Sequence, residues 1–231
     1  MRSQDEGAGM TTTTCRGPGV FHVLIAVLLV AVGATAGLAD TVKADTQRPA
    51  DTVAGQFLVA EEELEGTSFQ RTVIMMIEHG PAGALGVTVN RPLREAALTE
   101  LMVEVLGADA ARDAPIPQEA RVRVLSGGPV AQSSMLALHG PGFSAEKTVE
   151  VARGIHMTPV RAVMAALAEG EGPELDTLRL YLGHAGWSGG QLEGEKARGS
   201  WHVIPADPRL VFAEDPARVW REAMARRQRD L

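Results

Sequence analysis

The sequence has little cysteine, few aromatic residues and no excess of positive charge. Its 231 residues include a single cysteine, Cys15, which excludes an internal disulfide and a metal site built on several cysteines. Aromatic residues make up only 4%, so a core has to be built mainly from Val, Leu, Ala and Met. The formal net charge is −7. Because non-specific nucleic-acid binding requires a basic surface, no nucleic-acid partner is expected.

The N-terminal region contains the one long uncharged apolar run, Val20–Ala39, with Arg16 before it. Gly37-Leu38-Ala39 places small residues at the −3 and −1 positions of a cleavage site. This layout predicts a secretory signal peptide over residues 1–39, a mature chain that begins near Asp40, and a periplasmic or secreted protein. One alternative is an uncleaved inner-membrane anchor, since a run of about 20 apolar residues can span a bilayer. Another is a misassigned start.

The rest of the sequence predicts a linker followed by one folded region. Residues 40–54 are polar and aperiodic, which is typical of a flexible linker, and the folded domain is expected over residues 55–231. Short apolar runs between turn residues predict strands. These are Gln56–Ala60, Thr72–Glu78, Ala84–Val89, Arg121–Leu125, Met135–Leu138, Thr148–Ala152, Thr177–Leu182 and Trp201–Ile204. The second and third form a predicted hairpin around residues 79–83, which are rich in turn formers.

Helical spacing of apolar residues occurs in three segments, Arg94–Leu106, Thr158–Ala168 and Pro216–Arg229. Thr158 is the expected cap of the second helix, with Pro159 at its first position. Strands and helices do not alternate regularly. We therefore expect an α+β domain with a mixed, mostly antiparallel sheet.

A serine lies in a pattern that is typical of hydrolases. Residues 186–190 fit G-x-S-x-G, which can hold a nucleophilic serine on a turn between a strand and a helix. In α/β-hydrolases an acid and then a histidine follow that serine, whereas here His202 precedes Asp207. Two interpretations remain: Ser188 is a nucleophile with His202 as its base, or the segment is a glycine-rich turn. The density of glycines favours the turn.

Histidines and two further turns supply the other candidate groups. No histidine pair has the H-E-x-x-H spacing of a helical zinc site, and no pattern supports a metal site assembled from distant positions. Neither a metal nor a cofactor is expected. Glu78 and His79 are neighbours, which on a strand point to opposite faces. Residues 90–92 and 126–129 follow strands as turns, and their backbone N–H groups suit an anion.

Four stretches together resemble the YqgE/AlgH family of bacterial proteins. They are Gly55–Ala60 (GQFLVA), Glu78–Pro92 (EHGPAGALGVTVNRP), Gly127–Val130 with Leu138-His139 (GGPV and LH), and Gly183–Trp201 (GHAGWSGGQLEGEKARGSW). The closing DPARVW at Asp215–Trp220 also fits. The resemblance implies a single α+β domain with a bifurcated, barrel-like mixed sheet, and it implies no established reaction. The family's motif is similar to GWGPGQLE, with glycine at the position of Ser188, which disfavours catalysis there.

The same resemblance suggests a shared surface site for a small polar ligand or a protein partner. Its candidate ligand-binding residues are Glu78, His79, Asn90, Arg91, Gly127, Gly128, His139, Trp187, Gln191, Glu193 and Trp201. The alternatives are a hydrolase that uses Ser188 and His202, or Glu78, His79 and His139, and a cytoplasmic regulator of transcription. The last follows only if the N-terminal signal is not functional, because an exported protein cannot regulate transcription directly.

Overall fold

The computed structural model describes residues 52–64 and 67–227, and the expected signal peptide lies outside these residues. The strands are β1 (Gln56–Ala60), β2 (Val73–Gly80), β3 (Gly83–Thr88), β4 (Pro92–Ala97), β5 (Arg121–Ser126), β6 (Val130–His139), β7 (Val149–Ala152), β8 (Ile155–Pro159), β9 (Arg179–Ser188) and β10 (Trp201–Pro205). The helices are α1 (Leu98–Leu106), α2 (Ala108–Ala111), α3 (Val160–Ala168), α4 (Gln191–Ala197), α5 (Pro208–Val211) and α6 (Pro216–Arg227). Two short 3₁₀ turns, η1 (Glu62–Leu64) and η2 (Leu175–Thr177), complete the described chain.

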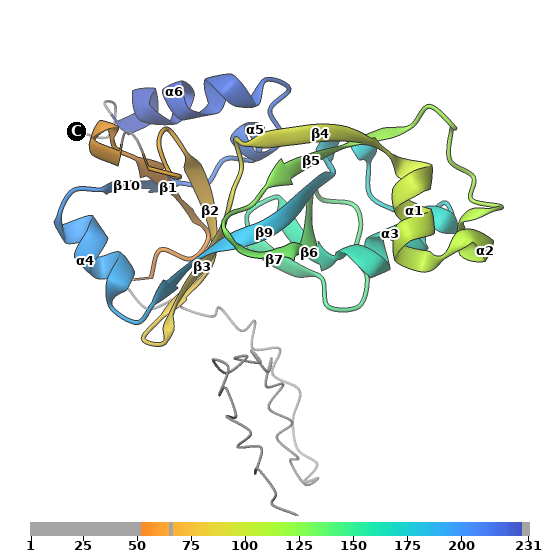
Figure 1. Ribbon diagram of the computed structural model, residues 1–231, viewed down its shortest axis with the longest axis horizontal. Coiled ribbons are helices and arrows are strands. Elements are labelled where there is room, and N and C mark those ends of the chain that lie inside the picture. Colours follow the sequence, from red (N-terminus) through yellow and green to blue (C-terminus); the bar gives the residue numbers. More distant parts are fainter. Residues whose placement is uncertain (1–51, 65–66, 228–231) are drawn as a thin grey trace, which may run out of the picture. The chain divides into compact units, whose positions relative to one another are not determined.

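One curled sheet connects all of these strands, in the order β10-β1-β2-β3-β9-β6-β8-β7, and it branches at β9 (Figure 1). The first half of β9 pairs in parallel with β5 and antiparallel with β6. Its second half, Ala185–Ser188, pairs antiparallel with β3 instead. The β5–β9 pair is parallel and the other pairs are antiparallel, so the expectation of a mixed, bifurcated α+β sheet is confirmed.

The branch point is built from three glycines whose backbones touch. A Cβ on Gly127 would overlap the carbonyl oxygen of Gly183, and a Cβ on Gly128 would overlap the backbone of His184. Gly183 has a φ of +70°, a left-handed conformation that side chains rarely adopt. The Gly127 N–H donates to the carbonyl of Leu182. Only residues without side chains let the turn after β5 lie against β9 while β9 changes partners.

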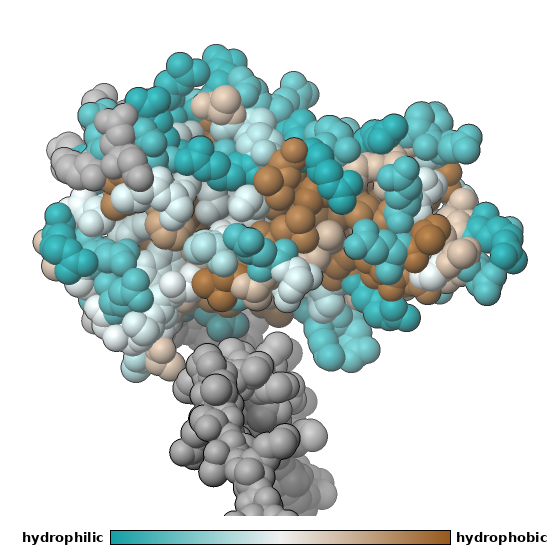
Figure 2. All heavy atoms as spheres, in the orientation of Figure 1, coloured by the Kyte–Doolittle hydropathy of each residue, from teal (hydrophilic) through white to brown (hydrophobic). Residues whose placement is uncertain are grey.

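Helices cover the sheet in three places. Alternate residues of β1 face opposite sides: Phe57 and Val59 pack under α5 and α6, whereas Leu58 and Ala60 face the cluster beneath α4. The branch that contains β5 and β6 packs against α1 and α3. Figure 2 shows that the outward sides of α4 and α6 are hydrophilic, while apolar side chains gather over the middle of the same view. No helix in the described ranges is long and apolar enough to cross a bilayer.

Several element boundaries differ from the sequence expectation. Arg94–Ala97 is the second part of strand β4, because these residues pair with β5, and the helix begins only at Leu98. Thr158 does not cap α3; it belongs to the unpredicted strand β8, and its hydroxyl contacts His139. The segment expected as a glycine-rich loop is instead the end of β9, followed by the unpredicted helix α4. The predicted hairpin is confirmed as β2–β3.

The glycine contacts at the branch point predict a selective loss of stability. We expect Gly128→Ala to lower the free energy of unfolding by about 3 kcal/mol, because the added methyl group has to displace backbone atoms. Gly142 is the matched control, since it also has a positive φ (+99°) but has no neighbouring heavy atom within 4 Å of the place that an added methyl group would take. Gly142→Ala should therefore cost only about 1 kcal/mol. Urea denaturation measures both, and equal midpoints would contradict the close packing.

Candidate functional site

The G-x-S-x-G segment spans the end of β9, Gly186–Ser188, and the two-residue turn before α4. The Ser188 backbone N–H and hydroxyl both donate to Oε1 of Gln191, over 3.1 and 3.2 Å. The left-handed residue of the turn is Gly190, at φ +78°, whereas Ser188 is not among the positive-φ residues. Ser188 therefore closes the start of α4 through Gln191, and its hydroxyl proton is already directed to that amide.

A single carboxylate ties α4 to the aromatic residues beneath it. Oε2 of Glu195 accepts the indole N–H of Trp187 at 2.9 Å and that of Trp201 at 2.8 Å, and Oε1 accepts from Gln191 at 3.0 Å. The two indole rings meet edge to face, with centroids 6.0 Å apart. Trp187 and Trp201 are only 7% and 6% exposed, which leaves little of either ring for a ligand. Burial raises the pKa of Glu195, but these three hydrogen bonds outweigh it and hold the pKa below its usual value.

Two residues earlier on α4, Glu193 contacts His79 on β2. Oε1 of Glu193 lies 2.6 Å from Nε2 of His79, and the other ring nitrogen, Nδ1, accepts the Val53 N–H at 3.2 Å. In this arrangement Nε2 carries the hydrogen and donates it to Glu193. The Glu193 backbone amide and the bond from His79 both lower the pKa of Glu193. His79 thus joins the segment before β1 to α4, and both of its ring nitrogens are in use.

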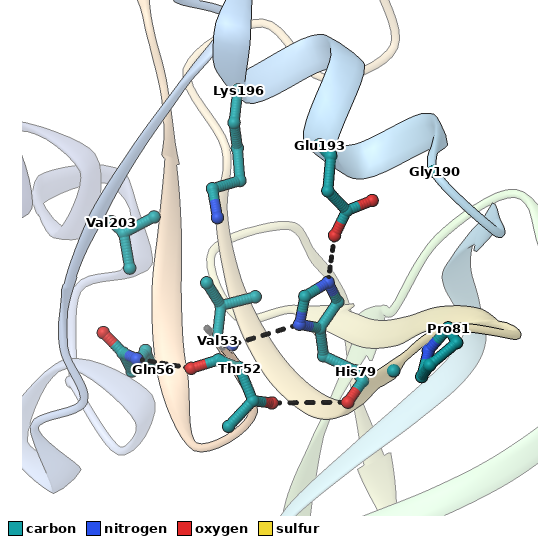
Figure 3. A pocket seen from close by; sticks show the side chains of 10 residues that line it. Thr52, Val53, Gln56, His79, Pro81, Gly190, Glu193, Lys196 and Val203 are labelled. Carbon is teal, nitrogen blue, oxygen red and sulfur yellow. Dashed lines mark hydrogen bonds and ion pairs between the residues drawn. The ribbon is translucent and has the colours of Figure 1, made fainter. Parts of the chain in front are cut away.

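These residues border a cleft of about 870 Å³, which we call the His79 cleft (Figure 3). Its walls come from the segment before β1, the β2–β3 hairpin, α4 and β10, and Thr52, Gln56, Pro81 and Val203 contribute to them. Lys196 extends from α4 into the opening, one helical turn beyond Glu193 (Figure 3). Its ammonium group forms no hydrogen bond or ion pair with residues 52–64 or 67–227. The cleft therefore presents an ammonium group that makes no hydrogen bond or ion pair with the described residues, and its charge helps to lower the pKa of Glu193.

Other predicted site residues lie elsewhere and hold the fold. Asn90 is buried, and its side chain accepts the Val73 N–H and donates to the Arg71 carbonyl, both at 2.9 Å. Arg91 donates to the carbonyl of Gln70, next to that turn. Gly127 and Gly128 form the branch point of the sheet. Glu78 is exposed and pairs across the hairpin with Leu85. It does not line the His79 cleft.

His139 is fully buried, far from the His79 cleft along the sheet order. Its Nδ1 donates to the carbonyl of Gly140, and its Nε2 accepts the hydroxyl of Thr158, both at 2.8 Å. Burial is the largest cause that lowers the pKa of His139, and nearby His156 lowers it further. His139 is therefore a neutral packing residue that fixes β6 to β8.

The structure does not assemble either catalytic alternative. Ser188 lies on β9 and His202 on β10, with β3, β2 and β1 between them in the sheet. His79 and His139 lie on β2 and β6, on the two sides of β3 and β9. In the described part of the chain, no three His, Cys, Asp or Glu side chains form a cluster that could hold a metal ion.

Of the residues that line the His79 cleft, the sequence pointed to His79 and Glu193, but not to Lys196 or Gln56. Gln191 was also predicted, but its side chain contacts Ser188 and Glu195 instead. Lys196 was missed because no helix was predicted over Gln191–Ala197. As a helix, QLEGEKA places Glu193 and Lys196 three residues apart and therefore on neighbouring surface positions. That spacing is the signal that could have found the residue.

The hydrogen bonds from the two indoles to the carboxylate of Glu195 give a pH-dependent prediction. Because the folded-state pKa of Glu195 is depressed, its stabilisation is present above the ordinary pKa of Glu and is lost as the pH falls through the folded-state value. Glu195→Gln should lower the free energy of unfolding at pH 7 by about 2 kcal/mol, since charge-assisted hydrogen bonds are lost. The deficit should shrink towards pH 3. Urea denaturation at both pH values tests this, with exposed Glu104→Gln as control, and an equal deficit at both would contradict it.

Comparisons with known proteins agree with this architecture. The AlgH-like family model matches residues 57–231. A UPF0301 protein of Methylococcus capsulatus is 36% identical over 176 residues, which are 76% of this chain and 91% of that protein. One from Methylocella silvestris is 39% identical over 162 residues, 69% of this chain and 78% of that protein.

Two solved structures share the fold. The solution structure of AlgH from Pseudomonas aeruginosa is 32% identical, with a TM-score of 0.59, and the match covers 78% of this chain and 91% of that one. The crystal structure of protein DIP2367 from Corynebacterium diphtheriae is 27% identical, with the same TM-score of 0.59, over 78% of this chain and 90% of that one. These names give no reaction. The resemblance to the YqgE/AlgH proteins is confirmed, and the chain belongs to the AlgH-like family.

Proposed function

We propose that this protein is an exported binding domain whose His79 cleft holds a small polar ligand with a free carboxylate group. The observation that carries the proposal is the ammonium group of Lys196, which faces the cleft without a hydrogen-bond or ion-pair partner in the described chain. The volume of about 870 Å³ suits a small molecule or the end of a peptide. Glu193, whose pKa is lowered, supplies an ionised acceptor for a cationic or N–H group on the same ligand.

Binding fits this cleft better than catalysis does. The imidazole of His79 already accepts from Val53 and donates to Glu193, so it has no free lone pair for a substrate proton. Ser188 donates to Gln191, and among residues 52–64 and 67–227 no histidine is its hydrogen-bond partner. A ligand with a carboxylate and an amino group would match Lys196 and Glu193 at once, and it would require no covalent step.

The binding prediction uses alanyl-alanine and its C-terminal amide as probes. We expect the free dipeptide to shift the backbone amide NMR signals of residues that line the His79 cleft, and the amide to bind at least about tenfold more weakly, because it lacks the carboxylate for Lys196. The Lys196→Gln substitution should weaken binding of the free dipeptide by a similar factor. Exposed Lys147→Gln is the matched control and should leave binding unchanged.

Two results would overturn this function. One is a set of amide shifts away from the cleft, or shifts that persist in Lys196→Gln. The other is labelling of the wild type by a fluorophosphonate probe that disappears in Ser188→Gly, which would make the protein a serine hydrolase. Ser188→Gly should retain dipeptide binding, since Gly at this position only removes the hydrogen bond from the Ser188 side chain to Gln191.

Export is the second part of the proposal, and it rests on Arg16, the apolar run and Gly37-Leu38-Ala39. We expect N-terminal sequencing of the protein expressed in a Gram-negative host to find a periplasmic chain that begins near Asp40. A full-length chain in the membrane fraction would favour the uncleaved anchor. A full-length chain in the soluble cytoplasm would refute export and revive the regulator of transcription.

A further inference from the structure

A second hollow, of about 470 Å³, lies on the other side of β10 from the His79 cleft. Val203 lines the cleft, whereas the next residue, Ile204, lines this hollow, and neighbouring residues of a strand point to opposite faces. We call it the Asp207 hollow. Three arginines from different elements line it: Arg153 from the turn between β7 and β8, Arg209 from α5 and Arg226 from α6.

Asp207 orients two of these arginines. Its Oδ2 accepts from Nη1 of Arg226 at 2.7 Å and from Nη2 of Arg209 at 2.8 Å, and its Oδ1 accepts the Arg209 backbone N–H at 2.8 Å. Burial raises the pKa of Asp207, but the hydrogen bonds from both arginines overcome this and lower the pKa to about 2. The carboxylate therefore stays ionised and keeps both guanidinium groups in place at the rim of the hollow.

The positive charge in the hollow is not neutralised. Three guanidinium groups face one carboxylate, which leaves an excess of two positive charges. Arg153 forms no hydrogen bond or ion pair with the described residues. Glu150 lies nearby on β7, where its Oε1 accepts the Gly154 N–H at 3.1 Å and holds the turn, but it does not line the hollow. Gly154 in turn lies against Pro208, so the turn is packed beside α5.

The three arginines that line the hollow all retain unused N–H donors. Arg226 donates to Asp207 through Nη1, and Arg209 donates to it through Nε and Nη2. Both side chains therefore keep N–H groups that are not hydrogen-bonded to Asp207, and all N–H groups of the Arg153 guanidinium are without a partner among the described residues. Planar guanidinium forks match the oxygens of phosphate groups, and pairs of N–H groups can bind them in a bidentate way. We propose that the Asp207 hollow binds a phosphate monoester dianion, with Arg153, Arg209 and Arg226 as its ligands. This site is independent of the His79 cleft.

The experiment follows the arginine Nε–Hε signals of the full protein by NMR, at constant chloride, as glycerol 3-phosphate is added. We expect saturable shifts for Arg153, Arg209 and Arg226, and an affinity at least about tenfold weaker in Arg153→Gln, because one of three charged ligands is lost. Arg153 is exposed and lies in a turn, so this change should leave the denaturation midpoint intact. Arg121→Gln, at an exposed position of β5, is the matched control and should bind as the wild type does.

Linear shifts without saturation, or equal weakening in Arg121→Gln, would overturn the site and indicate only the general attraction of an anion to arginines. Vesicles that contain phosphatidic acid serve as a second probe for the same chemistry. Arg153-dependent co-sedimentation with these vesicles, stronger than binding of glycerol 3-phosphate, would identify a lipid headgroup as the source of the phosphate. The reverse order would identify a free phosphate monoester, and binding of neither probe would refute the proposal.

Discussion

The close backbone contact between residues 127–128 and residues 183–184 is the constraint on which the rest of the structure depends. At this point β9 leaves β5 and β6 and joins β3, so one strand belongs to both parts of the sheet. A side chain at Gly127 or Gly128 would occupy the space of the β9 backbone. The direction in which β9 leaves the branch decides where its last residues and helix α4 come to lie.

A second close approach fixes α4 once β9 has passed the branch. Gly83 and Gly189 bring the β2–β3 hairpin against the end of β9, where a Cβ on either residue would meet backbone oxygen atoms. Glu195 then fastens α4 to Trp187 and Trp201, and Glu193 fastens it to His79. The position of Lys196 at the His79 cleft is therefore a consequence of packing around it. Most residues of the segment from Gly183 to Trp201 build this support, and few of them are free to contact a ligand.

The sequence was informative where a local pattern decides the structure. The β2–β3 hairpin, β1 and the helix from Pro216 follow from turn residues and apolar spacing, and the family follows from four ordered motifs. Local patterns gave wrong predictions where a residue distant in the sequence determines the local structure. Arg94–Ala97 has a helical pattern but is drawn into the sheet by β5, and the hydroxyl of Thr158 is taken by His139 instead of the helix end. The pairing of His79 with Glu193 joins residues 114 positions apart, and nothing in either local sequence indicates it. Both residues were predicted as site residues because they lie in the family motifs. Their contact could be seen only in the folded structure.

Ser188 is a case in which the local sequence suggested a catalytic group that the fold does not assemble. Its surroundings reproduce the local context of a hydrolase nucleophile, since a strand precedes it, a helix follows it and glycines flank it. What distinguishes a nucleophile is the group that takes its proton, and in a Ser-His-Asp triad that group comes from elsewhere in the fold. Here the acceptor is Gln191, three residues away, an amide that cannot act as a base. In this protein the glycines after Ser188 serve packing: Gly189 passes close to Pro81, and the left-handed Gly190 precedes the first residue of α4. The pattern therefore describes a tight strand-to-helix turn, and chemistry is added to such a turn only by its distant partners.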